Sequence, residues 1–383
     1  MIYLDHAATT KTRKEAIEVM VSCMETTYGN ASAIHSAGAD AKKALNIARS
    51  QVAALIGAKP SEIYFTSGGT ESDNWAVKAV AEAYGNQGKH IITSKIEHHA
   101  ILHSCQYLES KGYRITYLDV DEQGMVRCQD VEEAICPDTI LISIQFANNE
   151  VGTIEPVAQI GELARKRGIL FHTDAVQAFG QIPIEVQKLS VDLLSASAHK
   201  MGGPKGVGCL YIRDGLKMTA LLHGGSQERN RRAGTENVPG IAGFGAAAEA
   251  VAKELGEKQR KTLELRDYLI AKIKREVPEC RLNGHPVQRL PGNVNFSFAH
   301  VMGESLLIRL DMAGICASVG SACTSGSLDP SHVLLAMGLS KEEALGALRL
   351  TIDADNTKEE MDAAAEQIKK IVESLRAMSG WTF

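Results

Sequence analysis

The sequence lacks the features that mark membrane-spanning, secreted and nucleic-acid-binding proteins. None of its apolar runs reaches the roughly 18 residues that a membrane-spanning helix needs. Its formal net charge of −5 gives no electrostatic reason to expect nucleic acid or an anionic membrane as a partner. The N-terminus has no basic start followed by an apolar stretch, so it does not resemble a signal peptide. We therefore expect a cytoplasmic protein.

Cysteine pairs are also missing. The chain has eight cysteines but no C-x-x-C motif. Scattered cysteines in a chain without a secretion signal are usually reduced. Without paired spacing we expect no zinc or iron–sulfur site of the ordinary kind, and no resident metal. Most of the cysteines are predicted to be small core residues.

The length and the pattern of the chain predict an α/β fold with two domains. A chain of 383 residues is too long for one ordinary core. Strand-like runs are predicted at residues 62–66, 90–93, 114–118, 139–145, 168–172, 193–198 and 208–213, with helical patterns between most of them. Such alternation predicts a mainly parallel sheet flanked by helices on both faces. Ligands of these sheets bind at the carboxyl ends of the strands.

The character of the chain changes after a long predicted helix at about 239–276. Short strands at 294–298 and 347–352 frame a helix at 303–312, and a last helix at 357–377 closes the chain. This pattern is typical of a smaller α+β domain. We expect residues 16–255 to form the large domain, and residues 1–15 with 256–383 to form the small one.

One strand end contains a lysine. The run Leu193–Ala198 is apolar and small, and it ends in His199-Lys200 before a glycine-rich turn. Burial lowers the pKa of an amine, which makes it a nucleophile toward carbonyl compounds such as the aldehyde of pyridoxal phosphate. Taken alone, Lys200 is better explained as a solvated loop residue.

Polar residues at other strand ends supply the remaining parts of such a site. Ser67–Ser72 opens a helix with two glycines, which suits a phosphate. Asp174 could pair with a pyridinium nitrogen, and Gln177 follows one turn later. Each has an ordinary structural explanation, such as a helix cap. Their convergence on one edge of one sheet favours a cofactor site.

Two further strand ends offer candidate groups. Asn148 and Asn149 follow the run 140–145 and are either turn formers or amide donors. His98 and His99 follow the run 90–93, and an imidazole there could lie against a cofactor ring and move protons.

Cys323 differs from the other cysteines. It lies in Gly320-Ser321-Ala322-Cys323-Thr324-Ser325-Gly326, a small, polar stretch that is a poor place to bury a thiol. A cysteine in an exposed loop can reach a site and react as a thiolate. An unused surface thiol is an equally good explanation from composition alone.

Taken together, these motifs resemble the cysteine desulfurases of the NifS and IscS type, which are fold-type-I pyridoxal phosphate enzymes. The resemblance extends along the whole chain. Its most specific segments are Ser197-Ala198-His199-Lys200 and the group I form of the cysteine loop, Gly320–Gly326. It implies a homodimer that takes L-cysteine as substrate and passes sulfur to an acceptor protein, such as an iron–sulfur scaffold.

The resemblance also assigns roles to residues of this chain. Lys200 would bind the cofactor covalently and move the Cα proton, His99 would stack on the ring, and Cys323 would take the sulfur as a persulfide and could transiently ligate an iron–sulfur cluster. The remaining cofactor residues would be Gly69, Thr70, Asn149, Asp174, Gln177, Ser197 and His199, with Thr235 reaching the phosphate of the neighbouring subunit. Asn149 and Arg349 would hold the substrate, with Arg349 as a fork on its carboxylate.

Three positions depart from the expected family pattern. Asp353 stands where a glycine is usual, Val319 where a serine is usual and Ala31 where a proline is usual. None removes a group assigned to the chemistry. Two alternatives stay open: a selenocysteine or cystine lyase on the same scaffold, and a catalytically silent binding protein of the sulfur system. The retained Lys200 and Cys323 disfavour the silent protein.

Overall fold

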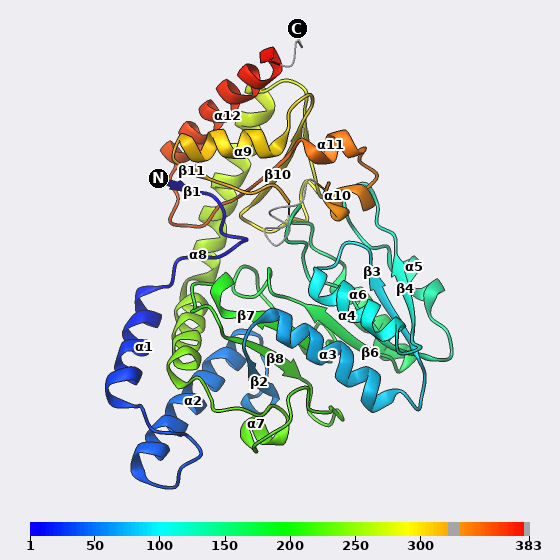
Figure 1. Cartoon of the computed structure of the whole chain (residues 1–383), viewed down its shortest axis with the longest axis vertical. Coiled ribbons are helices and arrows are strands. Elements are labelled where there is room, and N and C mark those ends of the chain that lie inside the picture. Colours follow the sequence, from blue (N-terminus) through cyan, green and yellow to red (C-terminus); the bar gives the residue numbers. More distant parts are fainter. Residues whose placement is uncertain (321–328, 379–383) are drawn as a thin grey trace.

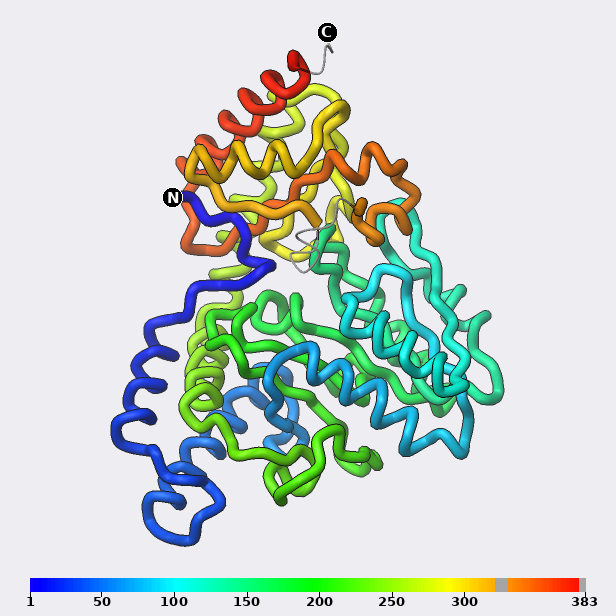
Figure 2. Tube along the Cα trace, in the orientation of Figure 1, coloured from blue at the N-terminus to red at the C-terminus, as the bar shows by residue number. Residues whose placement is uncertain are grey.

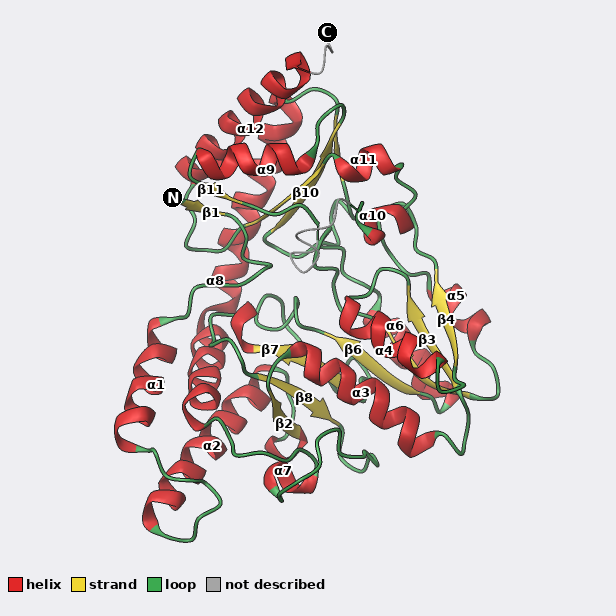
Figure 3. Ribbon diagram, viewed as in Figure 1, coloured by secondary structure: helices red, strands yellow, loops and turns green. Residues whose placement is uncertain are grey.

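The computed structural model describes residues 1–320 and 329–378. Its strands lie in two groups, one large sheet and a smaller group that consists of two separate sheets (Figure 3). The large sheet has seven strands in the order β2-β8-β7-β6-β5-β3-β4. Their bounds are β2 Ile63–Thr66, β3 His90–Ser94, β4 Arg114–Leu118, β5 Thr139–Ser143, β6 Leu170–Asp174, β7 Leu193–Ser197 and β8 Gly208–Ile212.

This sheet confirms the predicted α/β fold. Strands β7, β6, β5, β3 and β4 run parallel, and β8 is antiparallel to both of its neighbours. The strand predicted at 168–172 begins two residues later than expected. Gly168 adopts a left-handed backbone (φ 69°) and ends the preceding helix α6 (Val157–Arg167), which delays β6.

Helices cover both faces of the sheet because successive strand residues point to opposite sides. Leu193 packs in a cluster with residues of α3 (Gly69–Tyr84) and α4 (His99–Glu109). Leu194, the next residue, packs in a different cluster with residues of α2 (Ser36–Leu55), α6 and α8 (Val238–Glu276). The helices α1 (Lys14–Thr26), α5 (Cys128–Ala134) and α7 (Gln227–Asn230), with the short 3-10 helices η1 (Pro60–Glu62) and η2 (Ala198–Lys200), complete this part.

The smaller group of strands has its own core. Strands β9 (Cys280–Leu282), β10 (Asn293–Phe298) and β12 (Ala347–Thr351) form an antiparallel sheet in the order β12-β10-β9. The N-terminal strand β1 (Ile2–Tyr3) pairs in parallel with β11 (Ile315–Cys316). The helices of this part are α9 (Gly303–Met312), α10 (His332–Ala336), α11 (Lys341–Leu345) and α12 (Lys358–Met378).

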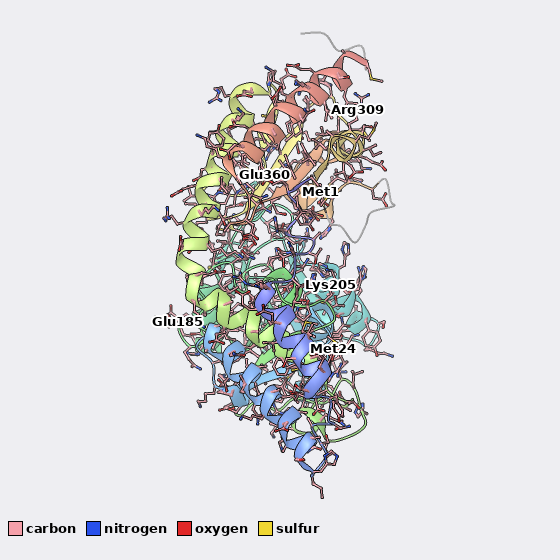
Figure 4. All side chains as sticks on the ribbon, turned by 90° about the vertical axis from the view of Figure 1, so that its left-hand side faces the viewer. Met1, Met24, Glu185, Lys205, Arg309 and Glu360 are labelled. Carbon is pink, nitrogen blue, oxygen red and sulfur yellow. The ribbon has the colours of Figure 1, made fainter. Side chains whose placement is uncertain are left out.

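Helix α8 links the two cores. It runs along one side of the molecule past both groups of strands (Figures 1 and 4). Its apolar residues up to Leu255 pack on the large core, and those from Leu265 to Ile273 pack on the smaller one. The N-terminal segment also joins the two parts, since it runs from β1 down to α1 (Figure 2). In the described part of the chain, no helix is long and apolar enough to cross a membrane.

Candidate functional site

Lys200 lies where β7 ends and is held by the N-terminal segment. Its Nζ donates hydrogen bonds to the carbonyl oxygens of Ala7 at 2.5 Å and Ala8 at 2.8 Å. The backbone carbonyl of Lys200 in turn accepts from Nε2 of Gln181 at 3.1 Å. The side chain is half-buried, so Lys200 is not the solvated loop residue of the simplest explanation.

Asp174 lies at the end of β6, on the strand next to β7. Its side chain is buried, and Oδ1 accepts from the backbone N–H of Val176 at 2.9 Å. Burial raises the pKa of Asp174 to about 6, while the positive charge of Lys200 opposes the rise. Gln177 donates through Nε2 to the same Ala7 carbonyl as Lys200, at 3.0 Å. The structure therefore brings Lys200, Asp174 and Gln177 together.

Asp73 is a residue of this site that the sequence reasoning missed. It lies in α3, is 1% exposed, and its carboxyl group lies beside the side chains of Asp174 and Ser195 and 3.8 Å from Nε2 of His172. Burial and the nearby charge of Asp174 raise the pKa of Asp73 well above its usual range, so we infer that Asp73 is the protonated partner. Ser195 continues the network to Nε2 of His172 at 3.0 Å. The sequence pattern around Asp73 did not predict that its side chain would be buried.

The start of α3 is built to approach an anion. Gly68 is the N-cap, and no side chain caps the helix, so the ordinary explanation of Ser67 or Thr70 as a cap does not hold. A Cβ on Gly69 would lie 2.5 Å from Cγ2 of Val176 and 3.7 Å from Cβ of Ser197. The glycine lets the chain pass close to Ser197 while leaving helix N–H groups for a phosphate. Thr70 is exposed at this end.

The predicted histidines have different surroundings. His199 contacts Oγ1 of Thr9 through Nδ1 at 3.1 Å, and burial lowers its pKa to about 4. His98 caps α4 by accepting from Ala100 N–H at 3.1 Å. His99 is half-buried, with its ring centroid 4.7 Å from that of His332. Burial lowers the pKa of His99, and His332 contributes to the shift.

Arg349 is almost fully buried beside the N-terminal segment. Its Nη2 pairs with Oδ1 of Asp5 at 2.9 Å, and Nη1 donates to the carbonyl of Asn149 at 3.0 Å. Its Nε is buried and has no hydrogen-bond partner among residues 1–320 and 329–378, which leaves a donor for another group. The side chain of Asn148 accepts from the N–H groups of Glu150 and Val151, so Asn148 is the turn former of the pair.

Two further residues were predicted for the site, Thr235 and Cys323. Thr235 is exposed on the loop before α8. Cys323 lies outside the described residues. Of the departures from the family pattern, Asp353 pairs with Lys258 at 3.1 Å rather than with Arg349. Val319 lies against Gly303, and Ala31 is buried in the large core.

The donor set fits pyridoxal 5′-phosphate. Lys200 offers an amine, Asp174 a buried carboxyl group close to it, and the uncapped start of α3 a place for the phosphate. His199, which the low pKa keeps neutral, and Ser197 border the same strand end. These groups come from separate segments that the sheet brings to one edge.

Comparison with known proteins shows the family of the chain. Residues 2–364 match the model of the aminotransferase class-V family. The chain is 55% identical over 381 residues to a cysteine desulfurase IscS of Methanosarcina thermophila, covering 100% of this chain and 94% of that protein. It is 52% identical over 380 residues to a cysteine desulfurase IscS of Clostridium botulinum, covering 99% of this chain and 96% of that protein.

Solved structures give the same result. A NifS-like protein superimposes with a TM-score of 0.92 at 39% identity, covering 97% of this chain and 99% of that one. SspA in complex with cysteine superimposes with a TM-score of 0.83 at 37% identity, covering 93% of this chain and 100% of that one. The chain therefore belongs to the class-V aminotransferase family and, within it, to the cysteine desulfurases of the NifS and IscS type.

Proposed function

We propose that this chain removes sulfur from L-cysteine, releases L-alanine and holds the sulfur as a persulfide on Cys323. In this step the Cβ–S bond of the substrate breaks, an S–S bond forms on Cys323, and a proton takes the place of sulfur on Cβ, so that L-cysteine and one thiol give L-alanine and one persulfide. No external oxidant or reductant is needed. The observation that supports the proposal most is the placement of the Lys200 amine beside the buried Asp174 in a chain of this family.

The enzymes of this family depend on pyridoxal 5′-phosphate. When bound, this cofactor supplies an electron sink that weakens the bonds at Cα of an amino acid. Lys200 would bind it, and Asp174 would place a negative charge against the pyridine nitrogen. Asp73, inferred to be protonated, would donate its hydrogen bond to Asp174 and hold that carboxylate in place.

Lys200 also has to move a proton. In this structure its Nζ donates to the carbonyls of Ala7 and Ala8, so it must leave these acceptors before it can bind the cofactor or act as a base. The anchor keeps the amine at the strand end in the meantime. His99 is the second candidate for proton transfer, because its lowered pKa keeps the imidazole neutral and able to accept a proton near neutral pH.

Arg349 would bind the substrate carboxylate. Asp5 and the Asn149 carbonyl hold two of its nitrogens, which fixes the plane of the guanidinium group. These two contacts therefore also fix the position of Nε, which is the nitrogen left to bind the substrate. Asn149 lies beside it and would contact the cofactor and the substrate.

We further propose a homodimer in the cytoplasm that passes its persulfide sulfur to an acceptor protein, such as an iron–sulfur scaffold. The exposed position of Thr235 supports a role across the subunit interface. Residues 16–255 would be the large domain, and residues 1–15 with 256–383 the small one. The separate apolar cores at the two ends of α8 support this division.

A turnover assay tests the chemistry. The holoenzyme is given L-cysteine and a thiol reductant, and L-alanine and sulfide are measured. We expect equal amounts of both products, no turnover for Lys200→Ala, and loss of sulfide release for Cys323→Ser with the cofactor absorbance retained. Cys280→Ser, a change at a half-buried cysteine of β9, is the matched control and keeps full activity. Native-rate sulfide release by Cys323→Ser would contradict the proposal.

Subunit mixing tests the role of Thr235. A hybrid of Lys200→Ala and Thr235→Ala chains contains one site with both changes and one with neither, if Thr235 acts across the interface. Mixing the inactive Lys200→Ala chain with the weakened Thr235→Ala chain should then restore activity. If Thr235 acts within its own subunit, both hybrid sites keep a defect and mixing restores nothing.

A further inference from the structure

A second cluster of reactive side chains lies at the opposite edge of the large sheet from Lys200. It consists of His90, Cys136 and Asp138, whose ligand atoms all lie within 4.8 Å of one another. Sγ of Cys136 is 3.1 Å from Nδ1 of His90 and 2.9 Å from Oδ1 of Asp138. The mechanism described above uses none of these residues.

We propose that His90, Cys136 and Asp138 form a binding site for one Zn²⁺ ion at the amino-terminal edge of the large sheet. One thiolate, one imidazole and one carboxylate are ligands that zinc accepts, and water can complete the tetrahedron. From zinc–ligand bonds of about 2.0–2.3 Å, tetrahedral ligands lie about 3.3–3.6 Å apart. The observed separations of 2.9 and 3.1 Å require the ligands to spread by roughly half an ångström.

The three ligands come from two segments, which backbone hydrogen bonds hold together. His90 is the first residue of β3, and Cys136 and Asp138 lie in the turn before β5, which begins at Thr139. The N–H of His90 donates to the carbonyl of Asp138 at 3.0 Å, and the N–H of Cys136 donates to Oγ1 of Thr139 at 2.9 Å. The turn is therefore tied to the start of β3 before any ion binds.

The orientation of His90 also suits a ligand. Its ring is fully buried, and Nε2 lies 2.8 Å from Oγ1 of Thr116. If Nε2 carries the proton and donates to Thr116, Nδ1 is the unprotonated nitrogen. It lies 3.1 Å from Sγ of Cys136 and 2.7 Å from Oγ1 of Thr139, so the Thr139 hydroxyl must turn away before zinc binds. A hydrogen bond on the distal nitrogen is the usual way in which proteins fix a metal-binding imidazole.

The guanidinium group of Arg114 already contacts two of the three proposed ligands. Nη2 of Arg114 lies 2.8 Å from Sγ of Cys136 and 2.9 Å from Oδ1 of Asp138. The side chains of Arg114 and Asp138 are 55% and 49% exposed, and such surface pairs are weak, so the guanidinium can move into solvent. Zinc would take its place between sulfur and oxygen, and the thiol proton would be released as the bond to zinc forms.

Zinc binding to the holoenzyme tests the proposal. The parent protein contains Cys323→Ser, so that the proposed catalytic thiol cannot bind the ion. Equilibrium dialysis against Zn²⁺, followed by metal analysis, gives stoichiometry and affinity, and the melting midpoint without metal checks that each variant is folded. We expect one ion per chain, more than about tenfold weaker binding in Cys136→Ser and Asp138→Asn, and parent affinity in the control Cys280→Ser.

Arg114→Gln separates this site from a merely structural cluster. It removes the competing cation, so we expect tighter zinc binding than in the parent and a larger rise of the melting midpoint with zinc. The proposal is overturned if the parent binds no zinc, if Cys136→Ser binds it as well as Cys280→Ser does, or if Arg114→Gln binds it more weakly than the parent.

Discussion

The substitution Asp174→Asn should stabilise the cofactor-free protein while it weakens cofactor binding. The carboxyl group is buried and ionises with a pKa of about 6 in the folded chain, against an ordinary value of 3.8. The folded state therefore binds the proton more tightly than the unfolded state does. Stability is lost as the pH rises through this window, and once both states are ionised the penalty is about 3 kcal/mol. Asparagine keeps the shape and the acceptor for the Val176 N–H but carries no charge.

The size of the effect depends on pH in a way that identifies Asp174. At about pH 5 the folded carboxyl group is still mostly protonated, and the penalty is only about half of its full value. At about pH 8 it approaches the full value, so the stability gained by Asp174→Asn should grow by roughly 1 kcal/mol between the two conditions. Burial and the charge of Asp174 also raise the pKa of Asp73, and Asp73 is present in both proteins that are compared.

Urea unfolding of the cofactor-free wild type and of the Asp174→Asn variant at the two pH values measures this difference. The same pair, saturated with cofactor, is the control, since a cationic ring would compensate the charge of Asp174 and remove the advantage of asparagine. An equal free-energy difference at both pH values would show that folding does not raise the pKa of Asp174. So would a variant that is less stable than the wild type at the higher pH.

Two further substitutions test the glycine at the start of α3 and the buried ion pair of Glu228 in α7. Gly69→Ala should lower cofactor affinity at least about tenfold in a fluorescence titration, because its Cβ would meet Val176 at 2.5 Å. The control Gly256→Ala, at an open position of α8, should keep the affinity and add about 0.5–1 kcal/mol of stability. Glu228→Ala breaks a buried ion pair with Arg49 (2.7 Å) and should cost about 3–5 kcal/mol in urea unfolding. Glu249→Ala, which breaks an exposed pair with Lys253, should leave the urea midpoint nearly unchanged.

The parts of the fold that depend on local patterns could be predicted from the sequence. The helix predicted at 239–276 is observed at Val238–Glu276, because its apolar residues recur with helical spacing over many turns. Asp174 and Lys200 were found because strand ends share one edge of a parallel sheet. The short strand β9 and the helices α10 and α11 were not predicted, since each has too few residues to show a period.

The parts of the site that depend on tertiary packing could not be predicted in this way. Asp73 looks like an ordinary polar residue of a helix, and only the fold buries it against Asp174. The pairing of Arg349 with Asp5 joins residues 344 positions apart. Most of the cysteines were expected in the core, but the turn before β5 places Cys136 half-exposed beside Arg114. Sequence position alone does not show which distant residues come into contact.

The central claim is that sulfur from L-cysteine passes to Cys323 as L-alanine leaves. The most direct test is a single turnover of the holoenzyme with isotopically labelled sulfur in L-cysteine and no reductant, followed by mass spectrometry of the peptides. The account predicts one labelled sulfur atom on the peptide that contains Cys323 for each L-alanine released, and none on the other cysteine-containing peptides. Release of L-alanine with no label on Cys323 would contradict it.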